Sequence, residues 1–408
     1  MSIARRTARA TLVAACWLLA VDARAGFTDT LPEGTFMLDE SIAFSVLNSR
    51  WDDDGNRAPM LDPVERYEPG GGLQGILTPE ADVNFLVLVS LLQYGITDSL
   101  TVAVGIPVVL RTTIDLDLQW EPGDFQPYIG RQFTEEDFWQ WAGSVGQNKP
   151  GDWSGNEGVL SDIILGVRWR FSDYFEWFED VAHMRVALMV MGALPTGKQV
   201  PPEEIAATGT TMWDLHSQGE LCFHLSLDQR FPGPLEDRLV LGLNFFYEIL
   251  FEHEYDTPTG SKNPLMLTFA PYVGDRYTLD PGDFSGVAID LGLVLLEGPA
   301  LATWLSDNDA DKAEKLPPML TVSLRYMFTH LQQSDWESDS EIWDWEREKL
   351  WMPGYKNTLF GRVSVSLLRV GVPLMLYVGY RNQTWIGGRN SRAADVFFGG
   401  IQVPAKFW

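Results

Sequence analysis

Carboxylates at alternate positions are the first groups in this sequence that could bind a metal ion. Two acidic stretches begin with the spacing of a calcium-binding EF-hand loop, Asp52 and Asp54 in one and Asp307, Asp309 and Asp311 in the other. An EF-hand also needs glycine at its sixth position and glutamate at its twelfth. Both stretches have a basic residue and a proline there, so an EF-hand is excluded. Loose divalent binding and solvated acidic turns remain as the two interpretations.

Residues with hydrolytic chemistry occur once in a suggestive order. Asp214, His216 and Ser217 superficially offer an acid, a base and a nucleophile. Adjacent residues of a strand point to opposite faces, so His216 and Ser217 cannot readily form the hydrogen bond that this chemistry needs. None of the five histidines lies in an HxxxH or HExxH pattern. The sequence therefore predicts no catalytic residue and no metal centre, and a lipid hydrolase stays as an alternative only.

A cofactor site is not expected either. Residues 70–75 read GGGLQG, which matches the GxGxxG spelling of a dinucleotide-binding turn. The motif follows Glu68 and Pro69 rather than a strand, and no amphipathic helix follows it. We interpret it as a flexible loop.

The elements that must position any site are indicated by residues 160–171, LSDIILGVRWRF. Large apolar side chains stand at every second position from Ile163 onward, and Asp162, Arg168 and Arg170 stand between them. Period two is typical of a β-strand with one apolar and one polar face. In a transmembrane barrel the apolar face contacts lipid and the polar face lines the lumen.

Similar stretches recur along the chain, most of them about ten residues long, which is the length that a tilted strand needs to cross a bilayer. With residues 160–171 they make thirteen candidates, and the others are residues 36–47, 83–93, 100–111, 185–194, 220–228, 239–248, 265–273, 284–296, 320–328, 360–368, 374–381 and 396–407. Bacterial barrels have an even number of strands. We therefore predict an all-β fold, an up-and-down antiparallel transmembrane β-barrel of twelve or fourteen strands, with twelve favoured.

The first 25 residues have the features of an export signal. A basic start precedes an apolar run over residues 10–21, and Ala23-Arg24-Ala25 has the small-x-small pattern of a cleavage site. We expect residues 1–25 to be removed and residues 26–408 to form the barrel. Removal changes the formal net charge from −26 to about −29. So acidic a chain is not expected to bind nucleic acid, which calls for a basic patch.

Connections between the candidate strands differ in length. Residues 95–99, 280–283 and 371–373 are tight turns, whereas 50–80, 120–156, 297–315 and 329–357 are long and acidic. Short turns at one end and long extracellular loops at the other are typical of the outer membrane of a Gram-negative bacterium. The chain ends on Phe407 and Trp408, an aromatic terminus that we expect the barrel insertion machinery to recognise. Lipid and lipopolysaccharide are the other expected partners.

Several of these pieces resemble one family of outer-membrane proteins. Residues 94–107, which begin YGITDSL and end in proline, are similar to a turn and strand of the MetA-pathway-of-phenol-degradation family. Residues 158–170, 194–197 and 388–407 resemble further segments of it. The resemblance implies a single-chain barrel for uptake of small, often aromatic or apolar compounds, and it implies no catalytic residues and no cofactor.

Polar residues on the predicted inner face are our candidate site. They are expected to line the lumen, and the set is Asp162, Arg168, Arg170, Glu220, His224, Asn244, Glu248, Asp290, Arg325, Arg362 and Arg381. The arginines either pair with the carboxylates or form a positive constriction, which is the interpretation we favour. The predicted function is a passive channel for small molecules. A closed structural or surface-binding barrel that contacts lipopolysaccharide is the alternative.

Overall fold

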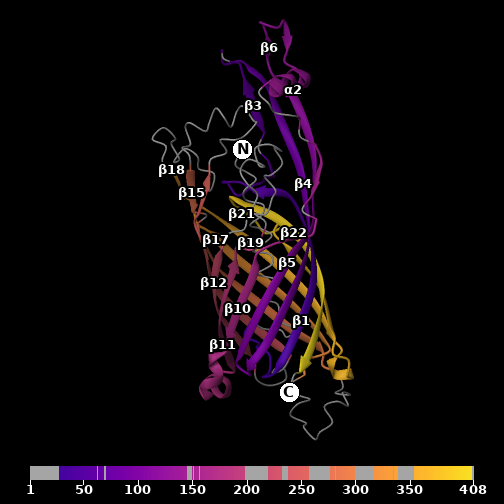
Figure 1. Ribbon diagram of the computed structural model, residues 1–408, viewed down its shortest axis with the longest axis vertical. Helices are drawn as coiled ribbons and strands as arrows, with labels where there is room; N and C mark the ends of the chain where they lie inside the picture. The colour runs from indigo at the N-terminus through magenta and orange to yellow at the C-terminus, as the bar shows by residue number, and fades with distance from the viewer. Residues whose placement is uncertain are drawn as a thin grey trace.

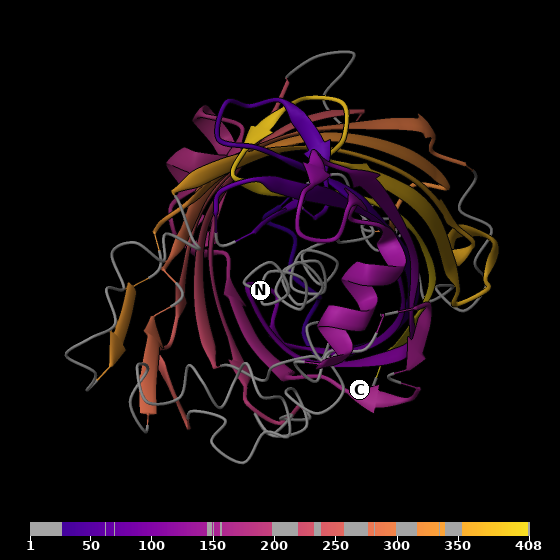
Figure 2. The ribbon, with the colours of Figure 1, turned by 90° about the horizontal axis from the view of Figure 1, so that it is seen from above.

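The computed structural model describes residues 27–406 except 62, 69, 145–148, 150, 156, 198–218, 232–237, 257–275, 281, 299–315, 334 and 339–352. The molecule is a closed antiparallel barrel of twelve strands (Figures 1 and 2). In order they are β1 (Thr35–Trp51), β4 (Leu73–Thr97), β5 (Leu100–Pro122), β10 (Ile163–Trp169), β11 (Met184–Leu194), β12 (Glu220–Arg230), β13 (Leu239–Leu250), β16 (Phe284–Leu296), β17 (Leu320–Leu331), β19 (Gly354–Ser366), β20 (Met375–Asn382) and β22 (Ser391–Lys406).

The first and last strands close the ring. β1 pairs with β22 from Thr35 opposite Lys406 to Trp51 opposite Ser391. β13 pairs directly with β16, and β17 with β19. The barrel therefore has the favoured twelve strands. The thirteenth candidate, residues 265–273, lies outside the described residues, as do Phe407 and Trp408.

The outer face of the barrel is apolar as the alternation predicts. Leu165 is 44% exposed and Leu324 is 57% exposed, whereas Arg168 and Arg325 on the other face are buried. A closed barrel satisfies every backbone group between neighbouring strands, so this face can be presented to lipid. No helix among the described residues is long and apolar enough to cross a membrane.

Single-residue labelling tests this register. Cysteines introduced at Leu165 and Leu324, in a Cys222→Ser background, should carry fluorophores that lipid-bound quenchers reach, because both side chains point outward. Fluorophores at the neighbouring inward positions Gly166 and Ser323 should escape the quenchers. Equal quenching at Leu324 and Ser323 would contradict the register of β17.

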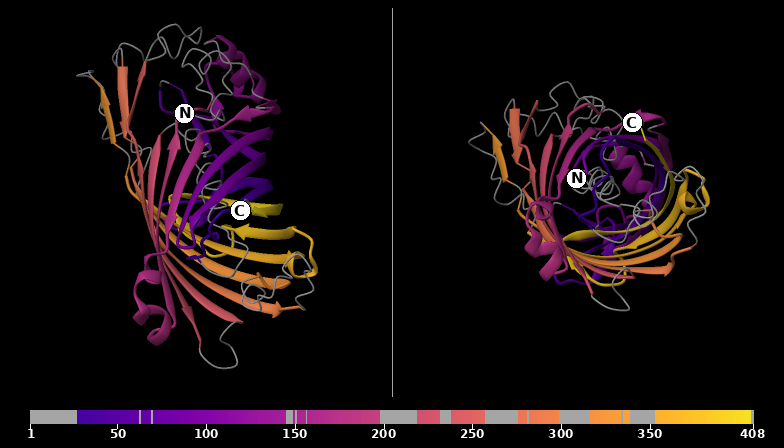
Figure 3. Two further views of the ribbon diagram at one scale, coloured as in Figure 1. Left: turned by 60° about the horizontal axis from the view of Figure 1, so that its bottom comes forward. Right: turned by 90° about the horizontal axis from the view of Figure 1, so that it is seen from below.

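Two of the connections between strands lie at the end of the barrel opposite to the one we expected. The turn at residues 95–99 joins β4 to β5 at the end where β1 begins and β22 ends (Figures 1 and 3). Because strand direction alternates, β16 ends at Leu296 and β17 begins at Leu320 at this short-turn end, although the connection between them was expected among the long loops. Residues 280–283 lead into β16 at the opposite, long-loop end. The predicted segregation of the connections was wrong at these two places.

Smaller elements complete the fold. At the short-turn end are η2 (Phe171–Tyr174) and η3 (Trp177–Val181) beside β11, and η6 (Leu368–Val370). The long-loop end carries the strands β2 (Arg57–Pro59), β3 (Val64–Tyr67), β6 (Phe125–Gln126), β7 (Arg131–Gln132), β8 (Trp153–Gly155), β9 (Val159–Leu160), β14 (His253–Asp256), β15 (Arg276–Asp280), β18 (Asp335–Ser338) and β21 (Gly388–Arg389), and the helix α2 (Glu135–Ser144).

β4 and β5 continue beyond the barrel as a tall hairpin that carries α2 (Figure 1). Phe138 of the helix forms a small buried core with Leu77 and Phe133. The guanidinium of Arg66 lies 3.4 Å from the centre of the Trp141 ring, and burial lowers the pKa of Arg66. Residues 120–156, expected to be a long loop, thus include a packed helix.

Candidate functional site

The predicted inner polar residues are buried, with one exception. Asp162, Glu220, His224, Asn244, Glu248, Asp290, Arg168, Arg325, Arg362 and Arg381 are each at most 8% exposed. Arg170 lies just past the end of β10, where its Nε donates to Asp173 at 2.7 Å and its Nη2 donates to the Asp98 carbonyl. The period-two pattern of the sequence predicted a strand as far as Phe171, but β10 ends at Trp169. Arg170 therefore belongs to the short-turn end.

One of these arginines has a carboxylate partner on the next strand. Arg325 and Asp290 stand directly opposite each other on β17 and β16, and Nε of Arg325 lies 3.5 Å from Oδ1 of Asp290. The sequence left open whether the inner arginines pair with carboxylates or form a positive constriction. Arg325 pairs with a carboxylate. Arg168 instead donates from Nη1 to the backbone carbonyl of Asp29 at 2.8 Å.

His224 on β12 belongs to a row of uncharged side chains that are linked by hydrogen bonds. The hydroxyl of Ser226 donates to Oδ1 of Asn244 at 2.8 Å, and Nδ2 of Asn244 lies 3.1 Å from Nδ1 of His224. Nε2 of His224 lies 3.2 Å from the sulfur of Cys222. Since the amide nitrogen of Asn244 can only donate, Nδ1 of His224 accepts and Nε2 carries the proton. The ring is thereby fixed in orientation.

An inward carboxylate that the sequence did not single out joins three strands. Asp39 on β1 accepts hydrogen bonds from the hydroxyl of Tyr377 on β20 at 2.8 Å and from Nε2 of Gln402 on β22 at 2.6 Å. The guanidinium of Arg362 stacks on the Tyr377 ring at 3.9 Å. Asp39 lies among Met37, Ser41 and Ala43 on the inner side of β1, and the alternation around it could have indicated its direction.

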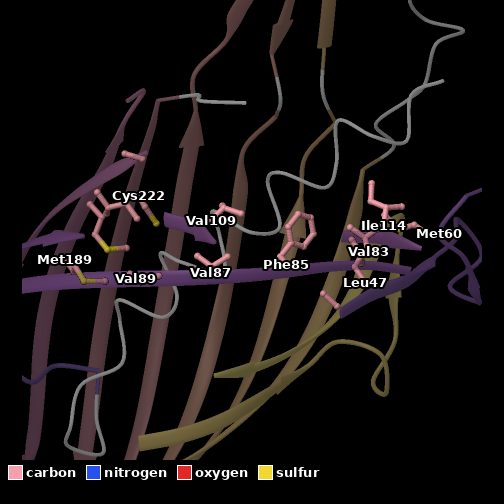
Figure 4. Close-up of a cluster of buried hydrophobic side chains, with 14 residues drawn as sticks. Leu47, Met60, Val83, Phe85, Val87, Val89, Val109, Ile114, Met189 and Cys222 are labelled. Atoms are coloured by element: carbon pink, nitrogen blue, oxygen red, sulfur yellow. The ribbon is translucent and has the colours of Figure 1, made fainter. Parts of the chain in front are cut away.

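Part of the inner face of the barrel is apolar (Figure 4). Every second residue of β4 from Val83 to Leu91 is buried on the inner face, and the residues between them form the outer face. These inward residues of β4 are Val83, Phe85, Val87, Val89 and Leu91, and they pack with Val109, Ile114, Met189 and Met191 of nearby strands. We call these nine residues the apolar stripe. In a water-filled barrel this face is polar.

The sequence contained a signal for the apolar stripe. Residues 85–92 form an unbroken apolar run apart from Ser90. Such a run is typical of a strand that is apolar on both faces. The predicted division into lipid-facing and polar residues does not apply to β4.

A second unpredicted feature lies inside the barrel. Residues 27–34, which we call the N-terminal strap, precede β1 and run along the inner face of the barrel wall. Gly34 donates to the Gly95 carbonyl on β4, and the Leu31 amide donates to the Thr101 hydroxyl on β5. Asp29 approaches Arg185 on β11 at 3.6 Å. The strap thus spans the inner surface from β4 to β12 near the short-turn end.

The strap is fixed most firmly at its first residues. The amides of Phe27 and Thr28 donate to the two carboxylate oxygens of Asp228 on β12, at 2.9 and 2.8 Å. The Thr28 hydroxyl donates to the same carboxylate at 2.6 Å. The Phe27 ring is 4% exposed and lies 4.2 Å from the guanidinium of Arg325. A segment of the chain itself therefore occupies part of the lumen.

Of the candidate metal ligands, the structure describes Asp52 and Asp54. The side chain of Asp52 accepts from the amides of Asp54 and Asn56, which makes it the first residue of a tight turn. No group of three or more possible ligands occurs among the described residues. Asp307, Asp309 and Asp311 lie outside that part of the chain, and so do Asp214, His216 and Ser217.

Comparison with known proteins supports the fold. No protein-family model matches the chain, so membership of the family that it resembles is not shown. No curated protein matches it either. Among solved structures, the COG4313 outer membrane channel from Pseudomonas putida F1 is similar at a TM-score of 0.50 and 9% identity, over 93% of this chain and 98% of that one.

Two further solved barrels are more distant. The CymD monoaromatic hydrocarbon channel has a TM-score of 0.33 at 9% identity, over 92% of this chain and 89% of its own. The β domain of the Bordetella autotransporter BrkA has a TM-score of 0.36 at 9% identity, over 90% and 98%. The closed barrel and its apolar outer face place this chain in the outer membrane of a Gram-negative bacterium, as predicted.

Proposed function

We propose that this barrel is a passive channel through which small apolar or aromatic molecules cross the outer membrane. The carrying observation is the apolar stripe on the inner face of β4. The free energy of an apolar solute falls when it leaves water for an apolar surface. A row of such side chains along a strand therefore offers successive weak sites rather than one tight site, which suits passage.

Polar residues elsewhere on the inner face support the same function. Asp39, Arg362 and Asp290 with Arg325 contact neighbouring side chains or rings. These contacts hold the polar groups in place and leave the apolar stripe as the surface for an apolar solute. Apart from Arg170, the predicted lumen-lining residues keep that role as part of this proposal.

Charge placed on the apolar stripe tests the proposal. The double variant Val87→Asp with Val89→Asp should lower entry of labelled toluene into intact cells by at least about tenfold, because the solute must then pass buried carboxylates. Entry of a small sugar should change little. The matched control Val87→Leu with Val89→Leu keeps the stripe apolar and should retain toluene entry.

The comparison requires equal amounts of folded protein, measured by the heat-dependent shift of the barrel on gels. Cells with the wild-type chain should take up toluene faster than cells without it. If the wild-type chain accelerates neither toluene nor the sugar, the passive channel is wrong.

A closed structural barrel is the second candidate function. It is favoured by the N-terminal strap, whose hydrogen bonds to Asp228 and whose buried Phe27 fill part of the lumen. In that function the apolar stripe would be packing surface only. Contacts with lipopolysaccharide and recognition by the insertion machinery remain predictions for either function, as does removal of residues 1–25.

A further inference from the structure

We infer that the place occupied by Phe27 is a binding site for an aromatic amine with two carbons between ring and nitrogen. The inference rests on the proposed channel, and it names a solute class for one site on the path. Phe27 itself carries this skeleton, because its ring, Cβ, Cα and amide nitrogen form an arylethylamine unit. The barrel holds both ends of that unit.

The ring end is buried and has one charged neighbour. Phe27 belongs to a buried apolar cluster that includes Ala288 of β16 and Met327 of β17. The Arg325 guanidinium lies 4.2 Å from its ring centre, within the range of a cation–π contact. Glycine at position 242 makes room for the ring, since a Cβ there would lie 2.7 Å from Cδ2 of Phe27.

The nitrogen end lies at a carboxylate. The amide of Phe27 donates to Oδ1 of Asp228 at 2.9 Å. The other oxygen of Asp228 accepts from the Thr28 amide and hydroxyl. A free ammonium group at the position of the Phe27 nitrogen carries three donors and could replace its hydrogen bond to Asp228. Its positive charge would strengthen the bonds to the carboxylate.

Asp228 also sets which solutes are excluded. An aromatic acid of the same length, such as phenylacetate, would bring a second carboxylate against Asp228 and leave both without a donor. Like charges at such a distance repel, and a buried unpaired charge is unfavourable. Toluene fits the place of the Phe27 ring but leaves Asp228 without a donor. The site therefore selects an aromatic cation over an aromatic anion or an aromatic hydrocarbon.

The strap competes with the solute for this site, so the experiment removes it. The full chain without residues 27–32, folded in detergent micelles, should bind 2-phenylethylamine at least about tenfold more tightly than the intact chain, and should not bind phenylacetate, by calorimetric titration. Asp228→Ala in the shortened chain should weaken 2-phenylethylamine binding by at least about tenfold. Gly242→Ala should weaken it sterically, whereas Gly361→Ala, where a Cβ meets no atom within 4 Å, should not.

An intact-chain measurement covers the case in which the shortened chain does not fold. A spin label on Glu33→Cys in a Cys222→Ser background should become more mobile when 2-phenylethylamine is added, because the amine displaces the strap. Phenylacetate should leave the label unchanged. Equal responses to the two compounds, or none to either, would overturn the site.

The outcomes separate this inference from the proposed channel. If toluene enters cells but 2-phenylethylamine neither binds the shortened chain nor releases the label, the Phe27 site is wrong and the channel stands. If the amine binds while no solute enters, the site stands in a closed barrel.

Discussion

Asp228→Ala is expected to raise the fraction of time that the barrel conducts ions by roughly a hundredfold. The carboxylate of Asp228 accepts three hydrogen bonds from Phe27 and Thr28, and it is 3% exposed. Hydrogen bonds to a charged group contribute about 1.5 to 3 kcal/mol each, so losing all three weakens docking of the strap by at least about 3 kcal/mol. Each 1.4 kcal/mol is about a factor of ten in the docking equilibrium.

Recordings from single proteins in planar bilayers measure this fraction directly. The matched control is Asp395→Ala, which removes a carboxylate that accepts from Asn382 at 2.8 Å near the start of β22, at the end of the barrel away from the strap. The control should conduct as rarely as the wild type. If Asp228→Ala is as silent as Asp395→Ala, the strap is not what closes the lumen.

Asp39→Ala is expected to lower the free energy of unfolding of the barrel by about 3 kcal/mol, the largest stability effect that we predict for one polar side chain. Asp39 connects β1, β20 and β22, where the barrel closes. Its removal leaves the Tyr377 hydroxyl and the Gln402 amide without their acceptor. Arg362, stacked on Tyr377, loses a nearby opposite charge.

Urea titration in detergent, followed by the gel shift of the folded barrel, measures the effect. Asp39→Asn keeps an acceptor for one of the two donors and should lose only about 1 kcal/mol. A similar loss for both variants would show that the side-chain shape, and not the hydrogen-bonded carboxylate, stabilises the seam.

The sequence by itself determined the strands and their outward faces. Residues such as Leu165 and Leu324 alternate with polar neighbours, and in a strand the period of two is a local property of the backbone. The even number that a bacterial barrel requires left twelve or fourteen strands, and the structure has the favoured twelve. The burial of Arg168, His224 and Arg325 opposite the lipid-facing residues agrees with the same periodicity.

Side-chain partners on nearby strands were decided by the tertiary structure. Arg325 meets Asp290 because β16 and β17 are neighbours in a fixed register, and Tyr377 meets Asp39 because the ring closes between β1 and β22. Alternation gives the direction of a side chain but not the register of its neighbours. For this reason the sequence left pairing and a positive constriction open.

The strap and the apolar stripe show the same limit most clearly. Nothing in the short segment from Phe27 to Gly34 indicates that its amides bind Asp228, some 200 residues later in the chain. The inward direction of Val87 and Val89 follows from alternation, but their lumen has an apolar wall only because β4, β5 and β11 lie close together around the barrel. Periodicity is encoded between near neighbours in sequence, whereas the contents of the lumen depend on contacts between residues far apart in the chain, which exist only once the barrel has closed.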